Sequence, residues 1–211
     1  MPRPGVPDSY RIKAQAEGYV ARSVYKLKAM DGKYRLLQPG QHVLDLGCAP
    51  GSWLQYLASR VGPTGVVVGV DLTPPAVPVA PPVFFVPGDL AGLDFAAVTA
   101  ISPDFDAVVS DMSPKTTGIR EVDQQRSLDL AFTAWEWARK LLKPGGHFLV
   151  KVFEGPEVEA LIRDLETAFR VCRRVKPPGS RAASKEIYLL ALHRRPAEQE
   201  KVRGQGDKAK G

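Results

Sequence analysis

The chain has few of the residues that form disulfide frameworks, metal sites and membrane spans. Its 211 residues contain two cysteines, Cys48 and Cys172, too few for a disulfide framework and typical of a reducing compartment. Its three histidines adjoin no cysteine pair and indicate no metal site. No apolar run approaches the ~20 residues of a membrane span, and residues 1–10 lack an apolar signal core. We therefore expect a soluble cytoplasmic protein that uses neither a membrane nor a metal.

Charge is plentiful but unevenly distributed. The net charge is +6, yet residues 41–150 hold seven Lys/Arg against eleven Asp/Glu. Residues 1–40 hold eight against three, and residues 151–211 hold fourteen against nine. An acidic centre between basic ends favours a small-molecule site in a core whose margins contact a polyanion. For the charge alone, a basic tail that merely aids solubility is the simpler explanation.

The length fits one domain with short appendages. Residues 1–20 are polar and carry three prolines, which predicts a basic arm that is flexible or ordered by its substrate. Residues 21–193 hold the core-forming sequence. The segment 194–211 is charged with almost no core-forming residues, so we expect a disordered basic tail.

Apolar runs of β type alternate with stretches of helical spacing in the central segment. The runs cover 42–47, 66–70, 83–86, 106–110, 147–153, 171–175 and 186–192, and the helical stretches cover 21–30, 53–61, 123–142 and 156–169. This order predicts an α/β protein: a single Rossmann-like fold whose seven-stranded sheet is mostly parallel and covered by helices on both faces. The last strand is expected to be antiparallel, because no full helix precedes it.

Ligands of such sheets bind beyond the carboxyl ends of the strands, so residues that follow strands are the informative ones. The first turn is Asp45-Leu-Gly-Cys-Ala-Pro-Gly51, whose glycines let backbone approach a ligand closely. Asp71 ends the second run, where a carboxylate can accept both hydroxyls of a ribose. Asp89 follows the third, where it can accept from the amine of an adenine. Singly, each aspartate is more simply a loop cap or turn former; as an ordered set they favour a nucleoside pocket.

The first turn is neither G-x-G-x-x-G nor a phosphate-binding P-loop. Pro50 also removes an N–H that a pyrophosphate would need. A nucleoside without phosphates is therefore favoured over a dinucleotide. S-adenosyl-L-methionine has this character, since it carries two ribose hydroxyls, an adenine amine and a cationic sulfonium.

These residues belong to a longer pattern that resembles the FtsJ/RrmJ (RlmE) family of S-adenosylmethionine-dependent rRNA 2′-O-ribose methyltransferases, over about Asp8 to Leu192. The matching segments are Ala21-Arg-Ser-Val-Tyr-Lys-Leu27, Asp45-Leu-Gly-Cys-Ala-Pro-Gly-Ser-Trp53, Ser110-Asp-Met-Ser-Pro114, Val150-Lys-Val-Phe153 and Ser180-Arg-Ala-Ala-Ser-Lys-Glu-Ile-Tyr188. Five motifs in order and at the right spacing make the match specific.

The resemblance implies a class I methyltransferase fold and a set of site residues. The implied catalytic residues are Lys26, Asp111, Lys151 and Glu186, with Lys151 as proton acceptor, and the implied cofactor contacts are Gly51, Trp53, Asp71, Asp89 and Asp111. The implied substrate is a uridine of large-subunit (23S-type) rRNA in the large ribosomal subunit, and we expect a monomer that acts in ribosome biogenesis. Two positions depart from the family: Ser52 stands where a second glycine is common, and Lys115 where an asparagine is common. We expect Ser52 to serve as a helix N-cap.

Methyl transfer to a ribose 2′-OH needs alignment and removal of the hydroxyl proton. An ammonium cannot accept a proton, so Lys151 must first lose one, which burial and the neighbouring cation Lys26 would favour. We expect Lys151 at the end of its strand, oriented by Asp111. Glu186 is expected to position Lys26 or the ribose.

Basic residues near both ends are candidates for contacts to RNA. They are Arg11, Lys13, Arg22, Lys28, Lys33 and Arg35, and later Arg173, Arg174, Lys176, Arg181 and Lys185. Tyr10, Tyr19 and Tyr25 could stack on unpaired bases, or could belong to the core. Trp135 is expected in the core. The alternatives to an rRNA enzyme are the same chemistry on tRNA or another RNA and, less favoured, a non-catalytic ribosome-assembly factor.

Overall fold

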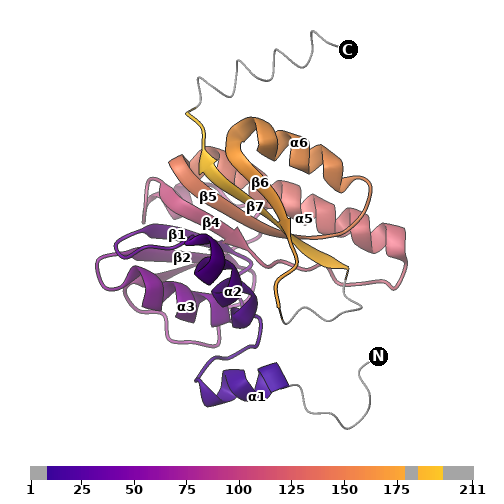
Figure 1. The fold of residues 1–211 in the computed structure, drawn as a ribbon. Coiled ribbons are helices and arrows are strands. Elements are labelled where there is room, and N and C mark those ends of the chain that lie inside the picture. Colours follow the sequence, from indigo (N-terminus) through magenta and orange to yellow (C-terminus); the bar gives the residue numbers. More distant parts are fainter. Residues whose placement is uncertain (1–8, 179–184, 197–211) are drawn as a thin grey trace.

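A computed structural model describes residues 9–178 and 185–196, and within these ranges one seven-stranded sheet forms the centre of the molecule (Figure 1). The strands are β1 (His42–Leu46), β2 (Val66–Asp71), β3 (Val83–Pro87), β4 (Phe105–Ser110), β5 (Leu142–Phe153), β6 (Phe169–Val175) and β7 (Glu186–Arg194). The helices are α1 (Ser9–Ala16), α2 (Val24–Tyr34), α3 (Ser52–Val61), α4 (Ala96–Thr99), α5 (Arg120–Leu141) and α6 (Val158–Ala168).

The order of the strands across the sheet is β3-β2-β1-β4-β5-β7-β6. Strands β1 to β5 are parallel to one another, and β7 is antiparallel to both β5 and β6. The chain leaves β1 toward β2 on one side and later returns to pair β4 on the other. The order therefore reverses at β1 and β4, and a crevice forms beyond their carboxyl ends. The predicted α/β fold with an antiparallel last strand is confirmed.

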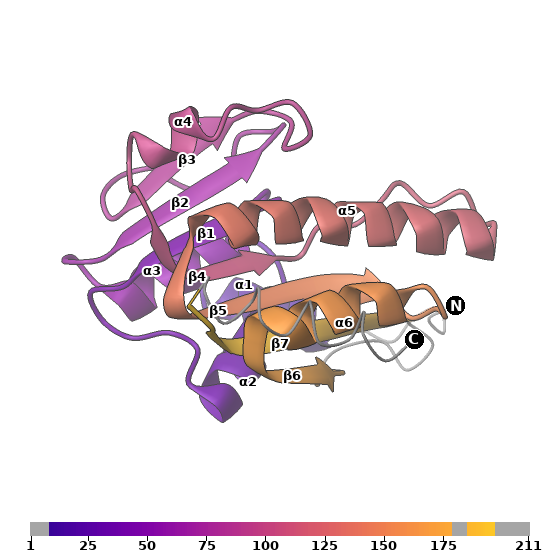
Figure 2. The same cartoon turned by 90° about the horizontal axis from the view of Figure 1, so that it is seen from above.

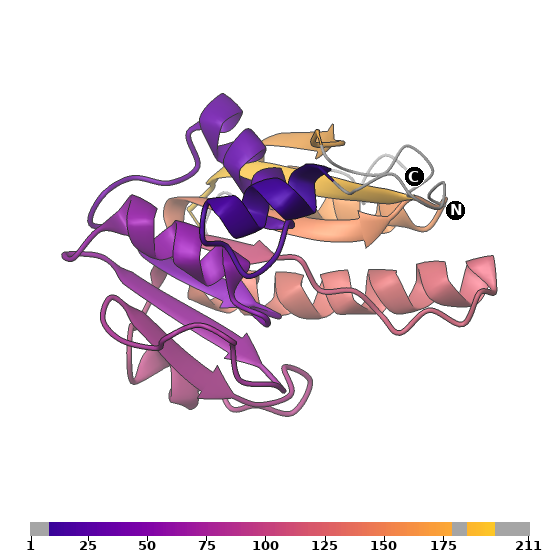
Figure 3. The same ribbon diagram turned by 90° about the horizontal axis from the view of Figure 1, so that it is seen from below.

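Helices cover both faces of the sheet. Figure 2 shows α5 and α6 over one face, and Figure 3 shows α1, α2 and α3 over the other. Adjacent residues of a strand point to opposite faces of the sheet. Val43 belongs to the core cluster that includes α2 and α3, and Leu44 to the cluster that includes α5 and α6. Burial on both faces explains why the central strands are almost continuously apolar.

Several boundaries differ from the sequence prediction. Residues 9–16 form α1, in which Ala14 is buried and Tyr10 packs on Tyr25, so this part of the arm predicted to be flexible or ordered by its substrate is a packed helix. Strand β5 begins at Leu142 rather than at His147, because Leu142 pairs with Phe105 before the register shifts. The short helix α4 was not predicted.

The first residue of the tail predicted to be disordered belongs to β7. Strand β7 extends to Arg194, whose guanidinium donates to carbonyls at the end of α5, among them Arg139 O at 2.6 Å. The remainder from residue 197, and Arg181 in the segment 179–184, lie outside the described residues. In the part of the chain that is described, no helix combines the length and apolar character needed to cross a membrane.

Candidate active site

A cavity of about 440 Å³ opens beyond the carboxyl ends of β1 to β4. Its lining includes Asp71 at the end of β2, Asp89 just after β3 and Asp111 just after β4. Parallel strands bring these three residues to one edge of the sheet although they lie far apart in the sequence. The volume is in the range of small-molecule sites.

The turn after β1 forms the floor of this cavity. Gly47 adopts φ +78°, and a Cβ there would lie 2.2 Å from Met112 Cγ, so a larger residue would displace the Met112 side chain. Ala49 N donates to Asp71 Oδ2 at 2.9 Å, which ties the turn to β2. Asp71 Oδ1 accepts from Thr73 N at 2.9 Å. Each carboxylate oxygen keeps a second lone pair with which it can accept from a ligand hydroxyl.

Two residues implied as cofactor contacts do not line the cavity. Gly51 is buried at the N-cap of α3 with φ 109°, and a Cβ there would lie 2.6 Å from Val77 Cγ2. Trp53 is 3% exposed, and its indole N–H donates to Ser23 O. Ser52 is not the N-cap, because that position belongs to Gly51; its hydroxyl is 2.9 Å from Ser23 Oγ instead.

Asp45 is a buried carboxyl group beneath the turn. It is 1% exposed, and its Oδ2 has no hydrogen-bond partner among the described residues. Burial raises the pKa of Asp45 well above its ordinary value, and the nearby charges of Asp111 and Asp71 raise it further. A cavity lined by Asp71 and Asp111, with Asp45 close enough to interact with both, fits a cationic ligand better than a neutral or anionic one.

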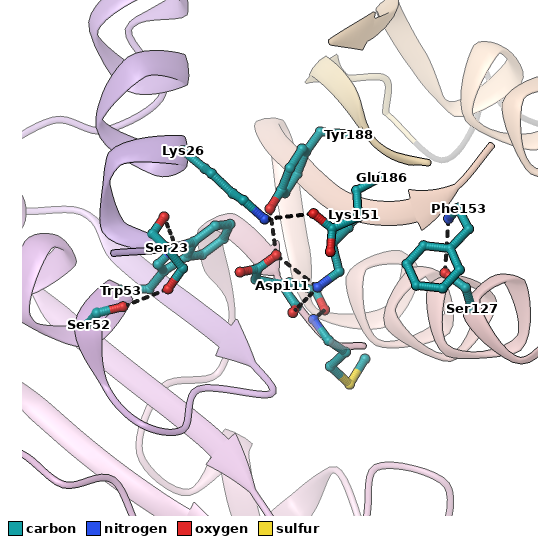
Figure 4. Close-up of polar contacts among 12 residues, drawn as sticks. Ser23, Lys26, Ser52, Trp53, Asp111, Ser127, Lys151, Phe153, Glu186 and Tyr188 are labelled. Carbon is teal, nitrogen blue, oxygen red and sulfur yellow. Dashed lines mark hydrogen bonds and ion pairs between the residues drawn. The ribbon is translucent and has the colours of Figure 1, made fainter. Parts of the chain in front are cut away.

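A second cluster of charged side chains adjoins the cavity at Asp111 (Figure 4). Lys151 Nζ lies 3.1 Å from Asp111 Oδ1 and donates to the carbonyl of the same residue at 2.7 Å. The Tyr188 hydroxyl donates to Asp111 Oδ1 at 2.5 Å. Burial, followed by the charge of Asp111, raises the pKa of the Tyr188 hydroxyl well above its ordinary value, so this group stays a proton donor.

Lys26 and Glu186 complete the cluster. Lys26 Nζ donates to Glu186 Oε2 at 3.0 Å and lies 5.6 Å from the centre of the Tyr188 ring. The structure thus brings Lys26, Asp111, Lys151 and Glu186 together from α2, the β4 loop, β5 and β7. Lys151 is not at the end of its strand as predicted; it pairs with Tyr188 two residues before β5 ends.

Sequence reasoning gave no role to Tyr188, Ser23 or Met112. A signal existed for Tyr188, because Glu186 and Tyr188 are two residues apart on one strand and therefore point to the same face. Ser23 and Met112 are defined only by tertiary contacts, and no local pattern marks them.

The basic residues proposed for RNA differ in their availability. Lys13 and Lys28 lie over the Tyr25 ring, 5.1 and 5.4 Å from its centre, and both pair with Glu17. Tyr25 itself is 8% exposed and belongs to the core, so it offers no free face to a base. Lys33, Arg35, Arg173, Arg174, Lys176 and Lys185 are exposed, and Arg174 pairs with Glu159. Trp135 is in the core as predicted.

The family model for FtsJ-like methyltransferases matches residues 19–194, nearly all of the ordered domain. The chain belongs to this family. Among its relatives, the "Ribosomal RNA large subunit methyltransferase E" of Desulfatibacillum aliphaticivorans is 45% identical over 183 residues, which are 87% of this chain and 88% of that protein. The protein of the same name from Syntrophobacter fumaroxidans is 44% identical, over 90% of this chain and 97% of its own.

The solved structures agree on the fold. A crystal structure described as that of a ribosomal RNA methyltransferase from Plasmodium falciparum superimposes with a TM-score of 0.72 at 25% identity, covering 83% of this chain and 98% of that one. Membership in the FtsJ-like methyltransferase family confirms the resemblance drawn from the five sequence motifs.

Proposed function

We propose that this methyltransferase transfers a methyl group from S-adenosylmethionine to a ribose 2′-OH of large-subunit rRNA, at a uridine of the 23S-type rRNA within the ribosomal subunit. The observation that carries the proposal is the double placement of Asp111, which lines the cavity and also holds Lys151. A single residue thus joins the donor side to the acceptor side. The names of relatives more than 40% identical to this chain support the ribosomal substrate.

The residues of the cavity fit S-adenosylmethionine. Asp71 would accept from the ribose hydroxyls and Asp89 from the adenine amine, while Asp111 supplies negative charge for a cationic ligand. The turn around Pro50 lacks the donors that a diphosphate needs. When bound, S-adenosylmethionine supplies a methyl group on a positively charged sulfur, which keeps the electron pair of the broken C–S bond as the new O–C bond forms.

Lys151 would take the proton of the 2′-OH. Its side chain is 4% exposed, and the two oxygens of Asp111 fix its amine at the rim of the cavity. To act as a base it must first release a proton to solvent, and it then accepts the hydroxyl proton as the oxygen attacks. General-base removal of a proton in this way contributes about 10²- to 10⁴-fold in rate.

Lys26 and Glu186 would orient the acceptor rather than exchange protons. Their ion pair places a donor and an acceptor on the RNA side of Asp111, 14% and 23% exposed. A ribose has hydroxyls that can both donate and accept, so such a pair can fix its rotation. Positioning of this kind lowers the barrier by holding the reacting atoms in line.

Labelled methyl transfer tests the proposal. Large ribosomal subunits from cells lacking the enzyme, free rRNA and bulk tRNA serve as acceptors, each with wild type and Lys151→Met. We expect label at a ribose 2′-oxygen of the subunits and its loss with Lys151→Met. Label on tRNA alone would overturn the ribosomal substrate, label undiminished by Lys151→Met would overturn the assigned base, and cofactor binding without transfer to any acceptor would favour an assembly factor.

A further inference from the structure

The carbonyl of Ser23 receives two hydrogen bonds, one from the backbone of Lys26 and one from the side chain of Trp53. Ser23 directly precedes α2, and its oxygen accepts from Lys26 N at 3.0 Å as part of the first helical turn. The same oxygen accepts from Trp53 Nε1 at 3.0 Å. The indole N–H of Trp53 and the backbone N–H of Lys26 therefore donate to the same carbonyl oxygen.

Ser52 adds a second contact to the same residue. Its hydroxyl is 2.9 Å from the hydroxyl of Ser23, and its side chain is buried, at 2% exposure for the residue. Ser52 and Trp53 are the first two residues of α3 and directly follow the turn that forms the floor of the cavity. The start of α2 is thus anchored, by backbone and by side chain, to the end of the cofactor turn.

The flat face of Trp53 reaches the other half of the cluster. Its ring stacks on Tyr188, with centroids 6.3 Å apart and planes inclined by 27°. Tyr188 donates to Asp111, and Lys26 lies over the Tyr188 ring. As Figure 4 shows, Trp53 lies between Ser23 and Tyr188. It therefore contacts Ser23, whose carbonyl accepts from Lys26 N, and Tyr188, whose hydroxyl donates to Asp111.

We propose that Trp53, assisted by Ser52, is a positioning residue that keeps Lys26 aligned with Glu186 and Asp111. This inference rests on the methyl transfer proposed above, in which Lys26 orients the acceptor. The side chain of Trp53 does not line the cavity, so it acts on the reaction through Lys26 and not on the cofactor. A tryptophan that merely fills the core would affect the free energy of unfolding and leave the reactivity of Lys26 unchanged.

The variant Trp53→Phe keeps a ring for Tyr188 but loses the N–H. Since one neutral hydrogen bond contributes about 1 kcal/mol, we expect kcat to fall about 5- to 10-fold while the KM for S-adenosylmethionine stays within about twofold. Ser52→Ala should lower kcat by about threefold, because Trp53 still holds the carbonyl. Trp135→Phe is the matched control, since Trp135 is equally buried on the opposite layer beside Phe148 and Phe169 and should leave kcat unchanged.

A double-mutant cycle with Lys26→Ala identifies the route of the effect. If Trp53 acts through Lys26, Trp53→Phe has no further effect on the residual single-turnover rate of the Lys26→Ala enzyme. Full multiplication of the two effects would overturn the proposal, as would a KM for S-adenosylmethionine that rises in step with the fall in kcat.

A second readout needs no activity. Acetic anhydride modifies lysine amines that are not held in ion pairs, and mass spectrometry measures the rate at Lys26. We expect modification of Lys26 to be about 3- to 10-fold faster in Trp53→Phe than in wild type or Trp135→Phe, because a loosened turn frees the amine from Glu186. An unchanged rate in the folded variant would contradict the positioning role. Failure of wild type to methylate any acceptor would instead contradict the proposed function. The rate of acetylation at Lys26 would still test whether Trp53 positions Lys26.

Discussion

Lys151 is bound twice by one residue, since its amine contacts both a carboxylate oxygen and the backbone carbonyl of Asp111. The contact spans two neighbouring strands at the point where the chain leaves β4. Because Asp111 also lines the cavity, any change at this position acts on two sites at once, whereas a change at Lys151 acts on one.

Substitutions at Lys151 and at Asp111 should therefore differ in their effect on cofactor binding. Lys151→Met removes the proposed base and leaves the cavity intact, so kcat should fall about 10²- to 10⁴-fold with the Kd for S-adenosylmethionine within about twofold. Asp111→Asn should lower kcat and also raise that Kd about 10-fold, as expected for the loss of a charge facing a cation. Calorimetric titration and single-turnover rates measure the two quantities, with Asp164→Asn on the exposed surface of α6 as control. Equal effects of both variants on Kd would contradict the division of roles.

The pKa of Asp45 predicts an unusual dependence of stability on pH. An aspartate in the unfolded chain titrates near pH 4, and burial raises the pKa of Asp45 well above that in the folded protein. The folded state therefore holds this proton more tightly, so the contribution of Asp45 to stability is present at low pH and is lost as pH rises through the folded pKa.

Asp45→Asn tests this contribution. The amide carries no charge into the buried site, so above the folded pKa we expect a higher melting temperature of the cofactor-free protein than for wild type. Above the folded pKa the same variant should bind S-adenosylmethionine more weakly, since it lacks the negative charge that ionised Asp45 adds beside Asp71 and Asp111. Melting curves between pH 4 and 8, with and without cofactor, measure both effects. A variant that is less stable at neutral pH would show that the Asp45 charge is compensated by groups other than those described.

Local sequence sufficed to predict the cavity but only part of the charged cluster. Asp71, Asp89 and Asp111 each end or follow a short apolar run, so their position at one edge of the sheet follows from the fold class. By contrast, the Lys26–Glu186 pair joins positions 160 apart, and the Tyr188–Asp111 bond joins positions 77 apart. No periodicity encodes such contacts; for the four charged residues the family resemblance supplied what the pattern could not.

The position of the Trp53 side chain could not be predicted from the sequence either. The family resemblance implied Trp53 as a cofactor contact, yet its indole lies among α2, α3 and β7, where it donates to Ser23 O and stacks on Tyr188. Helix α1 was missed for a related reason: it buries Ala14 and has little apolar sequence of its own, so its stability comes from packing on α2.

Asp31 is a buried carboxylate that joins two helices. It is 2% exposed and accepts from Leu37 N, from the Tyr56 hydroxyl and from Arg60 Nε, which ties α2 to α3. Asp31→Ala leaves three donors without an acceptor, so we expect a loss of about 2–4 kcal/mol in the free energy of unfolding.

Chemical denaturation measures this loss. Arg60→Met is the control, because that side chain is 42% exposed and its pair with Asp31 should contribute under about 1 kcal/mol. Both variants should keep the wild-type Kd for S-adenosylmethionine in the folded state. A larger loss for Arg60→Met than for Asp31→Ala would place the stabilising interaction in the ion pair rather than in the buried acceptor.

The exposed basic residues predict how RNA binding depends on salt. Each lysine or arginine that contacts a phosphate releases condensed counterions, so its removal should reduce the slope of log K against log salt by about 0.7–0.9. Lys33 and Arg173 are exposed, whereas Lys13 and Lys28 are partly neutralised by Glu17.

We therefore expect Lys33→Gln and Arg173→Gln each to reduce the slope by nearly the full value for one phosphate contact, and Lys28→Gln to reduce it by less. Lys140→Gln, at an exposed position near the end of α5 that does not line the cavity, should leave the slope unchanged. Equal slopes for all four variants and wild type would mean that the RNA backbone follows another surface, because a phosphate contact cannot be removed without changing the number of ions released.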